Sequence, residues 1–340
     1  MIKKIYKNLP RPLRVSISRI NYSLSGKPKV MPESNLRKTF PGSMKGGAMI
    51  SADFELGWAV RYSKHPKDPE EYSKRERENI PIILGHVDKY KIPVTWSTVG
   101  HLFLEECKEG DHDWMHRLPH FDDHWRFMEG DWFYCDPYSN YKDAPAWYAP
   151  DIIKKILNCK TEQELAYHTF SHIDCSYKNC PPEVIDDEFK VSTEIAKKWD
   201  IEFKSVTFPG GTAGNYETLK KYGIEICRKR IGDYELAYPF RNEQGLIVTA
   251  TGPAITIKYP EWSMDYSLSQ YKNAIDKAIR TNTFIHLWFH PSQKREDFTE
   301  LMPLIFEYMN KKRNEGLLWI ATMKEVAHYI NLVHRKNTHL

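Results

Sequence analysis

From Ala48 onward, short apolar runs alternate with stretches whose apolar residues recur at helical spacing. Residues 48–52 form an apolar run that ends at Asp53, which is typical of a buried strand. Residues 94–99 are rich in β-branched and aromatic side chains and lie between a proline and a glycine, so they also predict a strand. The other predicted strands are 165–168, 205–208, 224–227, 246–249, 284–289 and 317–320.

Helices are predicted between several of these strands. They cover 70–90, 182–198, 216–222, 267–280, 298–312 and 324–332. Strands that alternate with helices in this way indicate an α/β fold with a parallel sheet, either open or closed as a barrel. We therefore predict one α/β domain over residues 48–334, with an extension before it.

Residues 1–47 have a different pattern, in which Lys and Arg are interleaved with Leu, Ile and Val. A basic amphipathic segment can lie on an anionic membrane surface, dock onto a partner, or pack as an arm on its own domain. Residues 28–47 are rich in Pro, Gly and Lys and are predicted to be a connector. No apolar run of signal-peptide length occurs near the N-terminus, so we expect a cytoplasmic protein, with any contact to the inner membrane being peripheral.

Composition narrows the class of protein only a little. Lys and Arg number 49 against 45 Asp and Glu, a balance that argues against a nucleic-acid partner. The ten Trp residues suit a cleft that stacks sugars, and they equally suit a large core. Six cysteines without a C-x2-C pair indicate reduced thiols of an intracellular protein.

Residues 107–150 interrupt the alternation of strands and helices. They are crowded with Trp, Tyr, Phe, His and Asp. Because a connection of this length inside a compact domain is usually functional, we predict a lid or wall over the site. The alternative is a surface insertion with no role in binding.

Groups suited to catalysis follow several of the predicted strands, and the carboxyl ends of parallel strands meet at one edge of a sheet. Asp53 and Glu55 are two residues apart at the end of a strand, so their carboxylates can face the same way. His168 and His172 are four residues apart, and one helical turn would place both imidazoles on one side. The alternative is a capped helix start with two ordinary histidines.

Two further strand ends carry such groups. Residues 208–211 include two glycines that allow the backbone to approach a ligand closely. In the strand at 284–289, His286 and Trp288 share a face with His290, which precedes a proline that ends the strand.

These groups favour metal-assisted hydrolysis of an amide or ester. Two imidazoles and a carboxylate form a metal site with open positions, where a divalent ion polarises water and the substrate carbonyl. A second carboxylate can take the proton of the water, and a histidine can protonate the leaving nitrogen.

The chain resembles the polysaccharide deacetylases with a NodB homology domain, also called carbohydrate esterase family 4. Residues 51–58 match the first motif of that family, 168–172 the second and 287–291 the last, while 208–211 stand in the place of the third. The nearest match to the fourth motif is 261–265. The resemblance implies a distorted (β/α)7 barrel and removal of acetyl groups from sugars. It also implies one divalent metal ion, with zinc expected and cobalt, nickel and manganese as the other candidates.

The resemblance also implies roles for single residues. Asp53 would be the base, His168 and His172 metal ligands, and His290 the acid. Phe54 occupies the place of the usual second aspartate, so we expect Glu55 to be the anionic ligand, and the swapped assignment of Asp53 and Glu55 stays open. The predicted substrate-binding residues are Trp58, Pro209, Gly210, Gly211, Arg241 and Trp288. Among them, Arg241 is the candidate replacement for an arginine that the third motif lacks here.

The sequence thus predicts a metal-dependent deacetylase that acts on an acetamido sugar during synthesis of bacterial cell-surface polysaccharide, either O-antigen or capsule. The substrate would be a nucleotide sugar or a lipid-linked glycan. Two alternatives stay open: hydrolysis of another C–N bond, as in a cyclic imide or amide, and a degenerate domain that binds a glycan or serves as a scaffold.

Overall fold

The computed structural model describes residues 9–61, 68–119, 133, 135–257 and 262–335. In this part of the chain, one mixed sheet contains eleven strands in the order β1-β7-β10-β2-β3-β4-β5-β6-β9-β8, and β11 pairs with β2. The strands are β1 (Lys29–Val30), β2 (Gly46–Phe54), β3 (Thr95–Thr98), β4 (Glu164–Tyr167), β5 (Ser205–Thr207), β6 (Ile226–Lys229), β7 (Tyr234–Ala237), β8 (Phe240–Arg241), β9 (Ile247–Ala250), β10 (Phe284–Phe289) and β11 (Leu318–Ile320).

The central part of this sheet is parallel from β10 through β2, β3, β4, β5 and β6 to β9. The carboxyl ends of these strands therefore meet at one edge, as predicted. The register places Asp53 opposite Ser97, and Thr207 opposite Arg228, at this edge. All nine residues of β2 are buried because neighbouring strands pair with it on both sides.

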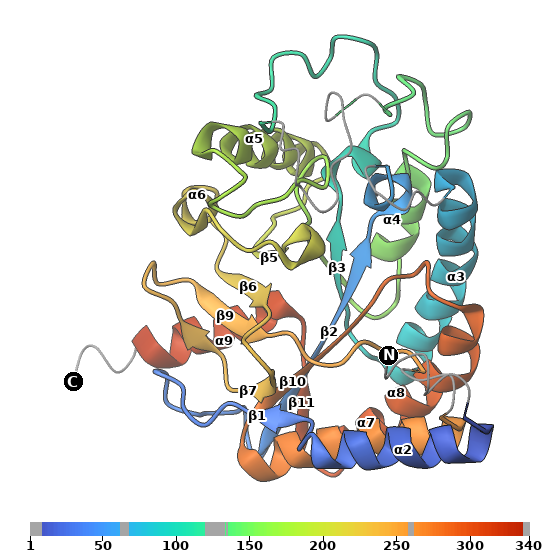
Figure 1. Cartoon of the computed structure of the whole chain (residues 1–340). Coiled ribbons are helices and arrows are strands. Elements are labelled where there is room, and N and C mark those ends of the chain that lie inside the picture. Colours follow the sequence, from blue (N-terminus) through green and yellow to red (C-terminus); the bar gives the residue numbers. More distant parts are fainter. Residues whose placement is uncertain (1–8, 62–67, 120–132, 134, 258–261, 336–340) are drawn as a thin grey trace.

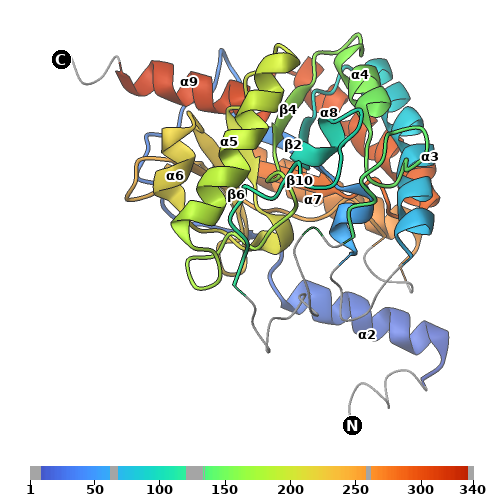
Figure 2. The same cartoon turned by 90° about the horizontal axis from the view of Figure 1, so that it is seen from above.

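The helices cover the sheet from several sides (Figure 1). Helices α3 and α8 lie beside each other on one flank, and α5 and α6 lie on the opposite flank (Figures 1 and 2). The helices are α2 (Arg11–Leu24), α3 (Pro69–Tyr90), α4 (Pro150–Leu157), α5 (Pro182–Lys198), α6 (Tyr216–Lys221), α7 (Met264–Thr281), α8 (Met302–Asn314) and α9 (Met323–Arg335). None of the described helices is long and apolar enough to cross a membrane.

The predicted α/β fold with alternating strands and helices is confirmed. The helix predicted over 182–198 has the bounds of α5, and the helix predicted over 70–90 begins one residue earlier, as α3. The prediction did not include α4, which follows the aromatic-rich segment, or the short strands β1, β7 and β8. β1 and β8 have two residues each, too few to show a periodic pattern, and β7 pairs with β1 and β10, which are distant from it in sequence.

The N-terminal segment packs as an arm on its own domain. Ser18 of α2 accepts a 2.8 Å hydrogen bond from the indole of Trp262, and the guanidinium of Arg19 lies 4.2 Å from the ring centre of Tyr266. Figure 1 shows α2 running alongside α7. In the nearest match to the fourth motif, Glu261 lies outside the described residues. Trp262 of the same match holds α2 through its bond to Ser18.

Candidate active site

The end of β2 places two carboxylates in one cavity. Asp53 and Glu55 line it together, whereas Phe54 lies in the core against Trp96. The predicted alternation of side chains is therefore confirmed. The buried carboxylate of Glu76 accepts hydrogen bonds from the backbone amides of Glu55, at 3.3 Å, and of Leu56, at 3.0 Å, and so fixes the chain just after the strand.

The two histidines of the second motif lie on a tight loop after β4. The predicted helical turn is wrong, because Thr169 and His172 have φ angles of 58° and 59°. The carboxylate of Glu188 from α5 accepts hydrogen bonds from the backbone amides of Phe170, at 2.7 Å, and Ser171, at 2.8 Å. These bonds replace the hydrogen bonds of a helix and stabilise a sharply curved loop.

This loop directs both imidazoles at Glu55. Its Oε1 atom lies 2.8 Å from Nε2 of His168 and 3.0 Å from Nε2 of His172. All three residues are buried. Burial raises the pKa of Glu55, but His172, His290 and the hydrogen bonds from the two loop histidines lower it more strongly, so the pKa lies well below its usual range. The carboxyl group is therefore ionised.

The donor atoms of this cluster fit a divalent cation. Nδ1 of His168 lies 2.8 Å from the carbonyl oxygen of Thr207, which only accepts hydrogen bonds, so Nδ1 carries the proton. In the neutral ring, Nε2 then presents a lone pair to a carboxylate oxygen that is also an acceptor. A second proton on the ring or a cation between the two atoms removes this conflict. Two imidazoles and one carboxylate are also a ligand set of catalytic zinc sites.

Asp53 lies beside this cluster and is paired with an arginine. Nη2 of Arg228 donates to Oδ2 of Asp53 at 2.6 Å, and the Thr207 hydroxyl donates to Oδ1 at 3.3 Å. Burial raises the pKa of Asp53, but Arg228 and two nearby histidines outweigh this effect, so the pKa is lowered. Arg228 thus orients Asp53 and keeps it ionised.

Arg228 has the role beside Asp53 that the sequence prediction gave to Arg241. The guanidinium of Arg241 instead bonds to the carbonyl of Gly245 at 2.8 Å and to the side chain of Asn331 at 2.6 Å, and Arg241 does not line the cavity. The predicted role of Arg241 is therefore corrected. The signal for Arg228 was a charged residue one position beyond a predicted strand, followed by Lys229 and Arg230. Only the curvature of the sheet brings it across to Asp53 on β2.

Asp53, Glu55 and Arg228 line a cavity with a volume of about 500 Å³, and His168 and His172 are not among its lining residues. His290 stands at its wall and is 32% exposed on its side chain; its Nε2 lies 4.0 Å from Asp53 and 3.8 Å from Glu55. Trp288 also lines the cavity, and Arg228 lies 5.2 Å from the centre of its ring. His286, on the same face of β10, is buried below them and bonds to the Ser51 hydroxyl at 2.9 Å.

The other predicted substrate contacts divide into two groups. Gly210 and Gly211 line the cavity and have φ angles of 60° and 73°, which favour glycine. Pro209 is buried and Trp58 is 1% exposed, and neither lines the cavity. The indole of Trp58 donates to the carbonyl of Trp147 at 3.1 Å, so the structure places this residue in the core.

The aromatic-rich segment does not reach this cavity in the part that the structure describes. Residues 107–119, 133 and 135–150 contribute no lining residue, although Met115, Phe133 and Tyr148 are buried. The predicted lid or wall is therefore not seen in these residues. Residues 120–132 and 134 lie outside the described part, so the prediction stays untested for them.

Comparisons with known proteins identify the fold. The sequence matches no protein-family model and no curated protein. The structure is similar to a protein from Mycobacterium smegmatis described as a polysaccharide deacetylase, with a TM-score of 0.61 and 12% identity over 89% of this chain and 96% of the other. It is similarly close to Puue allantoinase, with a TM-score of 0.60 and 11% identity over 89% and 95% of the two chains.

A protein from Pseudomonas aeruginosa PAO1, also described as a polysaccharide deacetylase, has a TM-score of 0.58 and 11% identity over 85% of this chain and 92% of its own. The chain therefore has the fold of the polysaccharide deacetylases, the distorted barrel that its motifs predicted. Identities this low show the fold alone, so function has to be argued from the site.

Proposed function

We propose that this protein is a metal-dependent hydrolase that removes the acetyl group from an acetamido sugar. The observation that carries this proposal is the meeting of Glu55, His168 and His172 beside the pair formed by Asp53 and Arg228, where Asp53, Glu55 and Arg228 line one cavity. A divalent cation held by the first three residues would polarise the acetyl carbonyl and lower the pKa of a bound water. The fold of polysaccharide deacetylases supports the choice of reaction.

The residues of the chain then divide the proton transfers between them. Asp53, ionised and oriented by Arg228, accepts the proton of the attacking water. His290, partly exposed at the wall of the cavity, donates a proton to the leaving nitrogen. Trp288 offers a flat apolar surface for a sugar ring, while Gly210 and Gly211 leave room for its substituents.

The position of Arg230 favours a substrate that carries phosphate. It is exposed at the rim of the cavity and has no ion-pair partner among the described residues. Lys27, by contrast, lies 3.7 Å from Glu235. A phosphate of a nucleotide sugar or of a lipid-linked glycan would fit beside Arg230, in the synthesis of a cell-surface polysaccharide such as O-antigen or capsule. Arg230→Gln should raise KM for a phosphorylated acetamido sugar but not for the free sugar.

The proposal is tested by acetate release from a panel of acetamido sugars, free, nucleotide-linked and lipid-linked. The protein is stripped of metal and then reloaded with zinc, cobalt, nickel or manganese. We expect acetate release to need the metal and to be absent from Glu55→Gln. Activity that is equal with and without metal would contradict the proposal, and no hydrolysis or metal binding across the panel would favour a glycan-binding scaffold.

A second candidate is hydrolysis of a C–N bond in a cyclic amide or imide. Puue allantoinase has the same fold, so the fold does not distinguish this reaction from sugar deacetylation. Allantoin and simple cyclic imides belong in the same panel. Ring opening of one of them without acetate release from any sugar would replace the first proposal by the second.

Contact with a membrane is part of the proposal for a lipid-linked substrate. Leu13, Ile20 and Leu24 on α2 are exposed by 48%, 56% and 79%, and α2 carries three arginines and no acidic residue. Such a surface suits anionic lipid. Changing these three residues to Gln leaves the contact of Ser18 with Trp262 in place and should lower co-sedimentation with anionic vesicles. Unchanged sedimentation would favour a nucleotide sugar as the substrate.

A further inference from the structure

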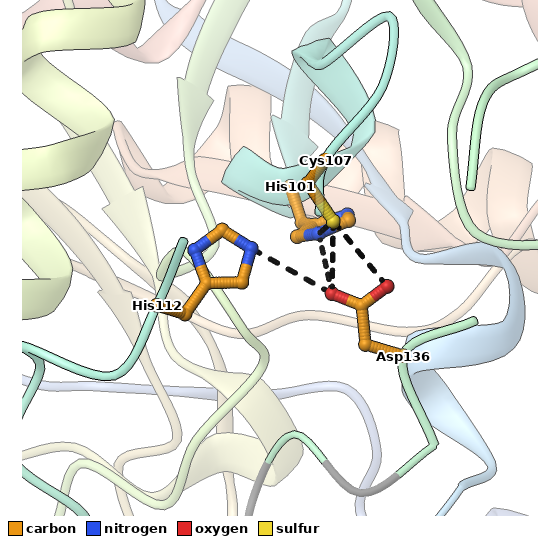
Figure 3. Close-up of side chains that lie close together, drawn as sticks. All are labelled: His101, Cys107, His112 and Asp136. Carbon is orange, nitrogen blue, oxygen red and sulfur yellow. Dashed lines mark hydrogen bonds and ion pairs between the residues drawn. The ribbon is translucent and has the colours of Figure 1, made fainter. Parts of the chain in front are cut away.

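A second cluster of metal-ligating side chains lies outside the cavity. It consists of His101, Cys107, His112 and Asp136, and all four are buried. Figure 3 shows that the thiol, the carboxylate and the two rings converge on one point. His101 belongs to the short helix η2 (Gly100–Phe103), and the other three residues come from the aromatic-rich segment that interrupts the fold.

Three of four donor-atom separations in the cluster match those around a tetrahedral zinc ion, and the fourth, between Asp136 and His101, is shorter. Zinc bonds of about 2.0–2.3 Å at tetrahedral angles place neighbouring ligand atoms roughly 3.3–3.6 Å apart. Sγ of Cys107 lies 3.6 Å from Nε2 of His101 and 3.3 Å from Oδ2 of Asp136. Oδ2 of Asp136 lies 3.6 Å from Nε2 of His112 and 2.9 Å from Nε2 of His101.

Hydrogen bonds to the outer atoms of the cluster leave the inner atoms to face one another. Nδ1 of His101 lies 3.2 Å from the carbonyl of Trp147, so it carries the proton and leaves a lone pair on Nε2. Oδ1 of Asp136 accepts hydrogen bonds from the Tyr148 hydroxyl, at 3.0 Å, and from the Tyr138 amide, at 3.1 Å. Oδ2 is thereby left to the interior of the cluster.

The ring of His112 supplies an independent observation. The residue is 6% exposed, and its Nε2 atom has no hydrogen-bond partner among the described residues. An unpaired buried ring nitrogen costs free energy, and a hydrogen-bonded network of Cys107, His101 and Asp136 would not relieve this cost. A cation at the centre of the cluster uses this nitrogen as its fourth ligand.

We propose that His101, Cys107, His112 and Asp136 bind a structural zinc ion. One thiolate and two imidazoles favour zinc over magnesium or calcium, and four protein ligands leave no open position for a substrate. Binding releases the thiol proton of Cys107 to solvent, and the metal takes the place of that proton. The ion ties three residues of the aromatic-rich segment to His101 on η2.

The second cluster also supports the loop of the candidate active site. The backbone amides of Gly100 and His101 donate to the carbonyls of Thr169, at 2.8 Å, and Phe170, at 2.9 Å. A Cβ at Gly100 would lie 2.7 Å from the Ser192 hydroxyl, so only glycine allows this close approach. A zinc ion at the second cluster would therefore stabilise the loop that carries His168 and His172.

Cobalt substitution of the full-length protein tests the proposal, because Cys107 is the one thiol in either cluster. Cobalt-loaded protein should show thiolate-to-cobalt charge-transfer absorption in the near ultraviolet and bind about two metal ions per chain, one per cluster. Cys107→Ser should abolish the band. Cys159→Ser, which changes a cysteine outside both clusters, and His172→Ala, which changes the other cluster, should keep it.

The readout needs no enzyme activity, so it stands apart from the test of the proposed function. If Cys107→Ser does not fold, His112→Gln gives the same comparison by weakening and shifting the band. Wild-type protein that binds cobalt without a thiolate band overturns the proposal and assigns the cluster as a hydrogen-bonded network. A band that persists in Cys107→Ser also overturns it, because another cysteine would then be the ligand.

Discussion

The two histidine clusters of this chain differ in the number of protein ligands and in access to solvent. Glu55, His168 and His172 offer three ligands beside a cavity of about 500 Å³. The cluster around Cys107 offers four ligands, and none of them lines that cavity. A catalytic metal needs an open position for water or substrate, whereas a structural one does not. The comparison therefore supports the proposals of chemistry at the first cluster and of stability at the second.

The same packing joins the two clusters. The ring of Phe170, between the two loop histidines in sequence, lies 5.4 Å from the ring of His101. Trp58, which follows Asp53 and Glu55 in sequence, lies 4.5 Å from the same ring. These contacts explain why Trp58 is buried instead of touching substrate. Damage to the second cluster should therefore reach the loop of the first one.

Loss of the anionic ligand should have the largest effect. Glu55→Gln keeps the shape of the side chain but removes its charge, so the first cluster should lose its metal while the second keeps its own. The loss of metal catalysis is worth several kcal/mol, and we expect acetate release to fall by roughly 10³-fold or more. Metal analysis and kinetics on the same preparation measure both effects. Full activity in Glu55→Gln would contradict a catalytic metal at the first cluster.

Loss of the base should lower activity without loss of metal. Asp53→Asn removes the proton acceptor but leaves the three ligands in place, so kcat should fall by about 10²–10⁴-fold. Metal content should stay at the wild-type value. The reverse result, in which Asp53→Asn loses the metal and Glu55→Gln keeps it, would show that the roles of the two carboxylates are swapped.

Changes to the second cluster should act mainly on stability. Asp136→Asn removes the anionic ligand, and we expect the free energy of unfolding to fall by about 3 kcal/mol, with a Tm lower by roughly 5–10 °C. Thermal unfolding with and without a chelator measures this change. Chelation should lower the Tm of the wild type but have less effect on Asp136→Asn. If Asp136→Asn lowered kcat at low temperature but left the Tm unchanged, the structural assignment would be contradicted.

The smallest effect is expected at Glu188, which holds the loop between the clusters. Burial raises the pKa of Glu188 above its usual range, although bonds from Ser171 and Phe170 and the charge of Arg61 lower it. For a carboxyl group whose folded-state pKa is raised, the stabilising contribution is full below the unfolded-state pKa and is lost as pH rises through the folded-state pKa.

Glu188→Gln removes this pH dependence because an amide does not titrate. The amide can still accept the backbone N–H bonds and can donate to the Ser171 hydroxyl. We expect the variant to gain up to about 1 kcal/mol relative to wild type at about pH 8 and to gain less at about pH 5. Thermal unfolding at both pH values measures the difference. Glu188→Ala is the matched control and should lose stability at both. Equal differences at the two pH values would show that Glu188 does not change its protonation state.

Much of the fold and part of the site follow from local patterns. The alternation of strands and helices predicted the parallel sheet, and the motifs around Asp53, His168 and His290 predicted which strand ends carry chemistry. Side chains that alternate along a strand place Asp53 and Glu55 on one face whatever the rest of the chain does. These features depend on residues close together in sequence, so the sequence by itself determined them.

The tertiary structure decided the features that join distant residues. Arg228 becomes the partner of Asp53 because the curvature of the sheet brings β6 across to β2, although three strands lie between them. Arg241 is excluded because β8 lies at the end of the sheet. The loop of His168 and His172 avoids a helical turn because Glu188, on another helix, binds its amides. The second cluster joins residues from 101 to 136 without regular spacing. No local pattern encodes such contacts, because they form only when the chain packs.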